Sequence, residues 1–167
     1  MKNLFEIINV TGADRIAFLQ GQFTQNIELL SSSKVLFGAL CSPKGRVFAT
    51  CQLFATKENI HIILPSQMTD LVIQRLNLYK LRANVFLERN NNTQLYCIHR
   101  QDDQSTIQNN KFLENYFVCH DLKKTNHMEI IIYGENQKSK MKNFDAHLNN
   151  EQWRAARIAN GIVDIVP

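Results

Sequence analysis

The sequence predicts an α+β fold with mixed or antiparallel sheets and helices packed on one side. An alternating apolar segment near the start predicts a strand, and a Pro-Lys-Gly turn between two long alternating segments predicts a β-hairpin. One helical apolar stripe follows the third strand of this series. The resulting order, β-α-β-β-β-α-β, favours hairpin-connected strands covered by helices.

The first strand is expected over residues 4–10, where apolar side chains alternate, and Thr11-Gly12 ends it. Asp14 is placed to cap a short helix that brings Phe18 and Leu19 to the sheet and ends near Gly21. A second short helical piece is expected over residues 26–30.

Strands over residues 34–42 and 46–56 form the predicted hairpin, and a two-residue loop would place Cys41 opposite Arg46. One face of this hairpin is expected to belong to the core: Leu36, Leu40, Val47, Ala49, Cys51 and Leu53. The other face mixes aromatic, thiol and cationic side chains. It would either hold a flat, partly anionic ligand or pack against another element with its polar ends in water.

A third strand over residues 60–64 leads to Ser66, which is suited to cap the next helix. The apolar stripe of this helix predicts a core face: Met68, Leu71, Val72, Leu76 and Tyr79. A strand over residues 84–88 completes the first domain, expected to span residues 1–90.

A second, smaller α+β domain is expected over residues 91–148, with three strands and a polar helix. Its predicted elements are strands 95–99, 116–120 and 128–133 and helix 135–148. Residues 149–167 are expected to form a helix, capped by Asn149 or Asn150 and stopped by Gly161, and a strand that returns to the first domain. Because an apolar segment follows this helix, we expect the chain to be the N-terminal part of a longer protein.

Composition limits the possible functions. The chain has 167 residues, is 44% hydrophobic and 20% charged, and carries a formal charge of +4, which is typical of a globular soluble protein. Its cations and anions are too evenly mixed to indicate a nucleic-acid surface, whereas an anionic small ligand suits it. No segment predicts a membrane span or a secretory signal, so a cytoplasmic location is expected.

No pattern predicts a metal site or a familiar catalytic loop. The four cysteines (41, 51, 97 and 119) contain no C-x-x-C pair, and the five histidines show no metal-ligand spacing. Free, buried or partly buried thiols are therefore expected. Gly-rich phosphate loops and Gly-x-Ser-x-Gly turns are absent from the sequence.

Four segments together resemble the YgfZ-type folate-binding proteins, relatives of the tetrahydrofolate-dependent T protein of glycine cleavage. These segments are Val10-Thr11-Gly12-Ala13-Asp14, Gln20-Gly21-Gln22-Phe23-Thr24-Gln25-Asn26, Cys41-Ser42-Pro43-Lys44-Gly45-Arg46, and Trp153 with Arg157, Ile158, Gly161 and Ile162. The resemblance implies a fold like the N-terminal region of the T protein, with residues 1–90 as a folate-binding type of domain.

The resemblance also implies a ligand and a role. The ligand is tetrahydrofolate or another reduced folate, and the role is to support assembly or repair of iron–sulfur enzymes, including enzymes that modify tRNA. The implied partners are iron–sulfur enzymes or assembly proteins, without direct nucleic-acid or membrane binding, and the implied state is a monomer. A binding or assembly factor is favoured over a catalyst, and no catalytic residue is predicted.

The candidate folate-binding residues are polar or cationic: Gln20, Gln22, Thr24, Asn26, Cys41, Lys44, Arg46 and Arg157. The amides and the hydroxyl would hydrogen-bond the ligand, while Lys44 and Arg46 would meet its glutamate carboxylates. A neighbouring Arg46 would favour the Cys41 thiolate. The alternative is structural: the glutamines close the helix end, Lys44 is a solvated turn residue, and Arg157 packs on Trp153.

The chain departs from the family pattern at four points, and two other functions compete with the binding role. Asn26 and Ala159 replace acids, Val163 replaces a proline, and the chain ends before the family's K-G-C-Y-x-G-Q-E segment. One alternative is a folate-dependent aminomethyl or methyl transferase, which needs a carboxylate to handle the transferred carbon unit, so Asn26 and Ala159 count against it. The other is a scaffold that no longer binds folate and only contacts partner proteins.

Overall fold

A computed structural model describes residues 4–30, 35–99, 116–122, 124, 127–133 and 148–166. The chain divides into two compact units. Unit 1 contains Met1–Asn90 and Asp164–Pro167, and unit 2 contains Asn91–Val163. Residues 135–147 of the predicted polar helix lie outside the described residues.

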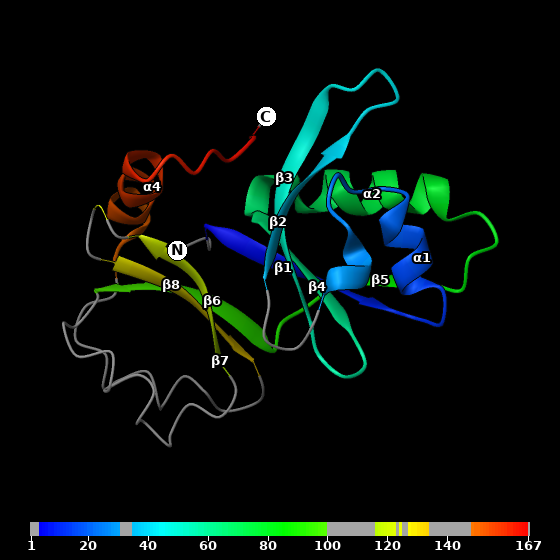
Figure 1. The fold of residues 1–167 in the computed structure, drawn as a ribbon, viewed down its shortest axis with the longest axis horizontal. Coiled ribbons are helices and arrows are strands. Elements are labelled where there is room, and N and C mark those ends of the chain that lie inside the picture. Colours follow the sequence, from blue (N-terminus) through cyan, green and yellow to red (C-terminus); the bar gives the residue numbers. More distant parts are fainter. Residues whose placement is uncertain are drawn as a thin grey trace. The chain divides into compact units, whose positions relative to one another are not determined.

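Unit 1 is built on a five-stranded antiparallel sheet (Figure 1). The strands in chain order are β1 (Phe5–Thr11), β2 (Leu36–Cys41), β3 (Val47–Ala55), β4 (Ile60–Pro65) and β5 (Phe86–Arg89). Their order in the sheet is β2-β3-β4-β1-β5, so the first strand lies inside the sheet and pairs with both β4 and β5. Every pairing in this sheet is antiparallel, one of the two arrangements that the sequence left open.

Helices cover one face of this sheet. They are α1 (Arg15–Gln20), η1 (Ile27–Leu29), η2 (Ser66–Met68) and α2 (Thr69–Lys80). The alternate residues of the strands that face them form one buried cluster with helix residues: Ile8, Val10, Ala49, Cys51, Leu53, Ile60, Ile62 and Leu64 with Phe18, Leu19, Ile27, Val72 and Leu76. This arrangement confirms the predicted α+β fold with helices on one side.

The buried stripe of α2 differs from the predicted one. Met68, Val72 and Leu76 are buried, whereas Leu71 and Tyr79 are 41% and 43% exposed. Thr69 is also buried and Ile73 packs against the core, so the face of α2 that meets the sheet is shifted from the predicted stripe.

Both predicted side-chain caps in unit 1 are wrong. Asp14 precedes α1, but its Oδ2 accepts a hydrogen bond from the Asn84 backbone N–H at 2.7 Å and none from α1. Ser66 lies inside η2, and α2 begins three residues later, at Thr69, without a side-chain cap. Asp14 instead ties the β1–α1 turn to the segment before β5.

The predicted hairpin is present, but its predicted register is wrong. Its loop has three residues, closed by hydrogen bonds from Gly45 N to Ser42 O and from Ser42 N to Arg46 O. Gly45 has φ +74°, a left-handed conformation that this loop type requires. Cys41 consequently pairs with Val47 and not with Arg46.

A bulge then changes the faces of β3. Leu40 pairs with Ala49, so Phe48 is an extra residue opposite the Leu40–Cys41 step. As a result Phe48 packs against the core and Val47, which was predicted to be buried, is 49% exposed. The remaining predicted core residues of the hairpin, Leu36, Leu40, Ala49, Cys51 and Leu53, are buried.

Unit 2 contains a three-stranded antiparallel sheet and a helix. The strands are β6 (Thr93–His99), β7 (Tyr116–Leu122) and β8 (His127–Tyr133), in the order β6-β8-β7, and the helix is α4 (Asn150–Ala159). Of the two candidate caps, Asn149 is the one used: its side chain accepts from Gln152 N while Gln152 Oε1 accepts from Asn149 N. Gly161, with φ +76°, follows the end of the helix.

The Gly12→Ala substitution tests the close approach of the β1–α1 turn to Asn84. A Cβ at Gly12, where φ is +102°, would lie 2.1 Å from the Asn84 carbonyl oxygen, whereas a Cβ at Gly45 meets nothing within 4 Å. We expect Gly45→Ala to lower the free energy of unfolding by about 1 kcal/mol, from backbone conformation alone. We expect Gly12→Ala to cost about 3 kcal/mol or more. Urea unfolding compares them, and equal costs would contradict the close approach.

Candidate functional site

The segment from Gln20 to Asn26 runs beside the edge strand β2. Phe23 forms an isolated antiparallel bridge with Leu40, and Thr24 N–H donates to the Ala39 carbonyl at 3.0 Å. The Thr24 hydroxyl oxygen accepts from Ala39 N–H, also at 3.0 Å. The motif therefore continues the hydrogen bonding of the sheet beyond β2.

Two amides of this segment hold the following turn. Gln20 Oε1 accepts from Ile27 N–H at 2.6 Å, and Asn26 Oδ1 accepts from Glu28 N–H at 3.1 Å, which caps η1. Because backbone donors fix both amide oxygens, each NH₂ group is left as a donor toward solvent or a ligand. The segment thus presents donors, which suit carboxylate or carbonyl oxygens of a ligand.

A hollow of about 310 Å³ lies next to this segment within unit 1. Its walls come from the start of α1, from η1 and from the β3–β4 turn, and they include the cations Arg15 and Lys57 and the carboxylate of Glu28. Ile27 and Glu28, whose N–H groups Gln20 and Asn26 hold, belong to its lining. The volume is near the lower end for small-molecule sites, about 300–1,000 Å³. None of the eight predicted binding residues lines it.

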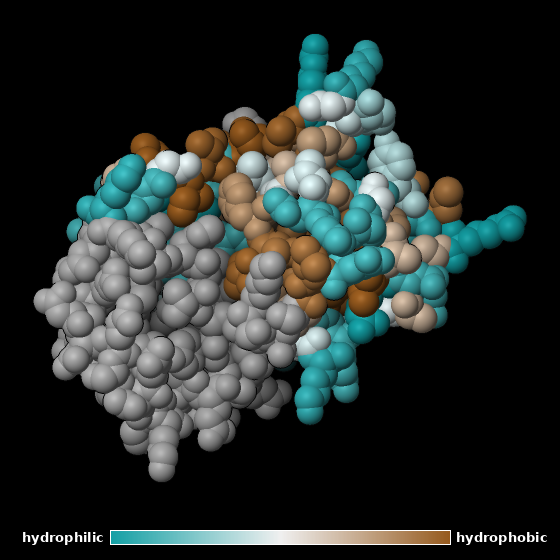
Figure 2. All heavy atoms as spheres, in the orientation of Figure 1, coloured by the Kyte–Doolittle hydropathy of each residue, from teal (hydrophilic) through white to brown (hydrophobic). Residues whose placement is uncertain are grey.

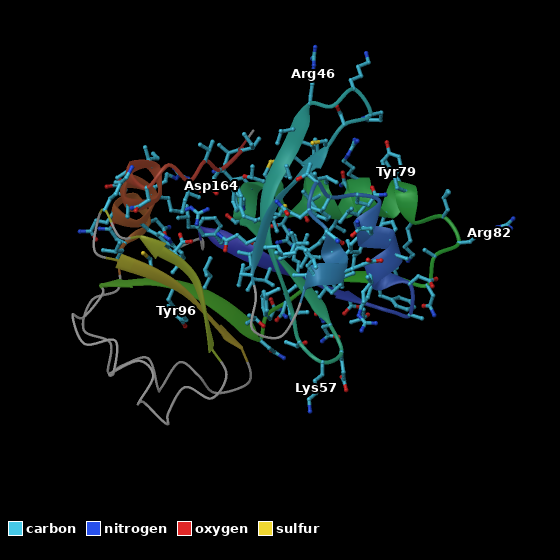
Figure 3. All side chains as sticks on the ribbon, in the orientation of Figure 1. Arg46, Lys57, Tyr79, Arg82, Tyr96 and Asp164 are labelled. Atoms are coloured by element: carbon cyan, nitrogen blue, oxygen red, sulfur yellow. The ribbon has the colours of Figure 1, made fainter. Side chains whose placement is uncertain are left out.

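The two predicted cations Lys44 and Arg46 lie at the exposed tip of the hairpin, and Figure 3 shows Arg46 directed away from the sheet. Cys41 is half-buried. Cys41 pairs with Val47, so these two side chains share a face of the hairpin. Arg46 precedes Val47 in the chain and points to the opposite face, so the predicted pairing of the Cys41 thiol with the Arg46 guanidinium is wrong.

Arg75 of α2 anchors this hairpin. Its guanidinium lies over the rings of Phe48 and Tyr79, at 5.1 and 5.3 Å from their centroids, and Nη2 donates to the Cys41 carbonyl at 3.4 Å. Sequence reasoning missed Arg75, because neither the α2 stripe nor the hairpin pattern indicates a contact 34 residues apart.

Arg157 lies in unit 2, where its guanidinium is 1% exposed and bound to Glu129. Nη1 contacts Oε1 at 2.5 Å and Oε2 at 2.6 Å, and Trp153 Nε1 donates to the same Oε1 at 2.6 Å. The carboxylate thus neutralises the cation and accepts the indole N–H. We assign Arg157 a structural role, and its predicted packing against Trp153 takes the form of a shared partner.

Burial shifts the pKa values of several described side chains, among them two thiols and a histidine. Burial raises the pKa of the Cys51 thiol to about 12. Burial also raises the pKa of the Cys97 thiol to about 12, and the negative charge of the facing Glu129 carboxylate contributes to that rise. His61 is stacked on Phe54 at 4.5 Å, and burial lowers its pKa to about 4. These thiols are protonated at neutral pH and are not nucleophiles.

His61 is held as a neutral ring. Asn90 Nδ2 lies 3.2 Å from Nδ1, and Thr56 Oγ1 lies 3.4 Å from Nε2. The amide is a donor, so Nδ1 accepts and Nε2 carries the proton. Within the described ranges, no three His, Cys, Asp or Glu side chains gather as a metal site would need, and no helix is long and apolar enough to cross a membrane.

Comparison with known proteins supports one family. No protein-family model matches the chain. A tRNA-modifying protein YgfZ from Hamiltonella defensa is 29% identical over 107 residues, which are 64% of this chain and 32% of that protein. A YgfZ protein from Yersinia pestis strain Pestoides F is 32% identical over 82 residues, or 49% of this chain and 25% of its own length.

The predicted resemblance to YgfZ-type proteins is confirmed. The matched segments cover only about a third or less of these curated relatives. The glycine cleavage aminomethyltransferase T from Bartonella henselae has a similar fold, with a TM-score of 0.59 at 11% identity over 77% of this chain and 40% of that protein. The predicted T-protein-like fold is confirmed as well.

The structure gives the YgfZ-type segments local tasks in this chain. Gly12 allows the approach to Asn84, Gln20 and Asn26 hold η1, Thr24 extends the sheet edge, and Gly45 closes the hairpin loop. Asn26 performs its capping task with the amide as well as the family's acid would. Ligand binding by the same residues stays a prediction.

Arg157→Met tests the buried ion pair. It leaves the Glu129 carboxylate buried without a cation, so we expect a loss of about 3–5 kcal/mol in the free energy of unfolding. Adding Glu129→Gln should restore part of that loss. Trp153, the only tryptophan, reports unfolding of unit 2 by fluorescence. Arg154→Met, on the exposed side of α4, is the control. If Arg157→Met lowers the free energy of unfolding as little as Arg154→Met does, the structural role of Arg157 is contradicted.

The His61 ring predicts a pH dependence of stability. Its pKa falls from the ordinary 6.5 to about 4 in the folded chain, so the unfolded chain binds the proton first as pH falls. Stability is therefore complete above pH 6.5 and declines toward pH 4, by up to about 3 kcal/mol. Urea unfolding at several pH values should show a flatter profile for His61→Gln. Parallel profiles would rule out His61 as the source.

Proposed function

We propose that this chain belongs to a reduced-folate-binding protein of YgfZ type that supports assembly or repair of iron–sulfur enzymes, including those that modify tRNA. The similarity to proteins named tRNA-modifying protein YgfZ carries this proposal. The T-protein-like fold is consistent with it. A cytoplasmic, monomeric protein fits this role.

The donors along residues 20–26 support a folate ligand that offers oxygen acceptors. The free NH₂ groups of Gln20 and Asn26, the amide of Gln22 and the Thr24 hydroxyl are suited to the carbonyl and carboxylate oxygens of the glutamyl part. Lys44 and Arg46, at the exposed hairpin tip, suit the more distant carboxylates of a polyglutamyl tail. Cys41 would lie between these two groups as part of the hairpin.

Chemistry at position 26 favours a binding role over transfer of a carbon unit. A transferase needs a carboxylate near the reacting nitrogen, and Asn26 supplies an amide whose oxygen is already bound to Glu28 N–H. The binding role, the transferase and the folate-free scaffold differ in two measurements. Both the binding protein and the transferase would bind reduced folate, and only the transferase would cleave a methylamine-type substrate.

Calorimetric titration with tetrahydrofolate tests the proposal directly. We expect binding of both monoglutamyl and polyglutamyl forms to the folded chain, without substrate cleavage. If no heat of binding is measured with a sample whose circular dichroism shows that it is folded, the folate proposal is wrong and the scaffold function is favoured.

Arg46→Ala should weaken the binding of polyglutamyl folate by about threefold and that of monoglutamyl folate by less. The effect is small because an exposed ion pair contributes about 0.2–1 kcal/mol. Arg82→Ala is the matched control, since Arg82 is an exposed arginine on the turn after α2, away from the hairpin tip (Figure 3). Equal weakening of both folates would remove Arg46 from the carboxylate-binding role.

A further inference from the structure

The turn after α2 holds a leucine in a conformation that suits glycine. A hydrogen bond from Ala83 N to Lys80 O at 2.9 Å closes a turn whose second residue is Leu81, with φ +45° and ψ −111°. Glycine normally occupies this position of a type II′ turn. Among the described residues, Leu81 is the only one other than glycine with a positive φ.

Burial does not compensate for this strain. Leu81 is 88% exposed, and two more large apolar side chains beside it in the sequence are also exposed, Leu78 at 75% and Phe86 at 54%. A glycine would suit the backbone better, and the core would lose nothing. The apolar side chain therefore has no role in the stability of unit 1.

Two cations adjoin Leu81 in the sequence, Lys80 before it and Arg82 after it. Lys80 Nζ lies 5.3 Å from the centroid of the Phe86 ring, and Arg82 projects outward from the turn (Figure 3). Between Asp70 and Glu88 the sequence carries Arg75, Lys80 and Arg82 and no carboxylate. The packed neighbour Asp14 has its carboxylate on Asn84 N–H. In Figure 2 hydrophobic and hydrophilic side chains lie together on this turn.

We propose that this surface docks an acidic, amphipathic segment of a partner protein. We call it the Leu81 patch: Leu78, Lys80, Leu81, Arg82 and Phe86. Apolar side chains of the partner would contact Leu78, Leu81 and Phe86, while its carboxylates would pair with Lys80 and Arg82. This inference goes beyond folate binding and does not depend on it.

Other occupants fit the patch less well. A second copy of the chain would bring the same cations and a formal charge of +4, so like charges would oppose pairing. Nucleic acid would use the cations but would leave Leu78 and Leu81 without apolar partners. An acidic amphipathic segment matches both halves of the surface.

Fluorescence anisotropy with two designed peptides tests the proposal. Both are helical peptides of about 15 residues with leucine and phenylalanine at i, i+3, i+4 and i+7, and their other positions carry glutamate in one and lysine in the other. We expect the acidic peptide to bind, more weakly at high salt, and the basic one not to bind. Leu81→Gly should weaken binding about tenfold or more while the thermal midpoint stays equal or rises.

Matched variants make the outcome decisive. Leu78→Ser should weaken binding like Leu81→Gly, and Arg82→Gln should also lower the salt dependence. Val47→Ser and Lys57→Gln, exposed changes of similar kind elsewhere in unit 1, should leave binding unchanged. Equal binding of the two peptides, unchanged binding by Leu81→Gly and Leu78→Ser, or stronger patch-dependent binding to phosphatidylglycerol vesicles or single-stranded RNA would overturn the proposal.

Discussion

The contact between the β1–α1 turn and the segment before β5 determines how unit 1 closes. Gly12 brings its backbone against Asn84, where a side chain on residue 12 would overlap the carbonyl, and Asp14 binds Asn84 through both its N–H and its carboxylate. This contact fixes the entry of α1 and the start of β5 at the same place. β1 is then flanked by β4 and β5, and α1 and α2 reach the same face of the sheet.

The polar residues of the YgfZ-type segments are used first by the fold. A folded chain leaves few backbone donors without partners. Gln20 and Asn26 each accept one from the η1 turn, and Thr24 accepts one from the outer edge of β2. Each side chain keeps a donor after this task. In the proposed binding role, the structural hydrogen bond would fix the orientation of the donor that remains for the ligand.

Local patterns in the sequence predict much of unit 1, and long-range partners explain what they miss. Alternation and glycine positions identify the strands and the Pro-Lys-Gly hairpin, because these depend on neighbours in sequence. The hairpin register depends on one extra residue, Phe48, which alternation cannot distinguish from its neighbours. Arg157 looks like a ligand-binding cation until Glu129, 28 positions away, is placed beside it.

The same distinction separates the two candidate surfaces of unit 1. At residues 20–26 and at the hairpin tip, the side chains offered to a ligand come from segments in which only Gly45 has a positive φ, which glycine adopts without strain. At the Leu81 patch the backbone is unfavourable and the leucine is exposed. Strain without burial gives no gain to the isolated chain, so a contact outside it is the physical reason to keep leucine there. The two proposals, folate binding and partner recognition, therefore concern different elements of unit 1.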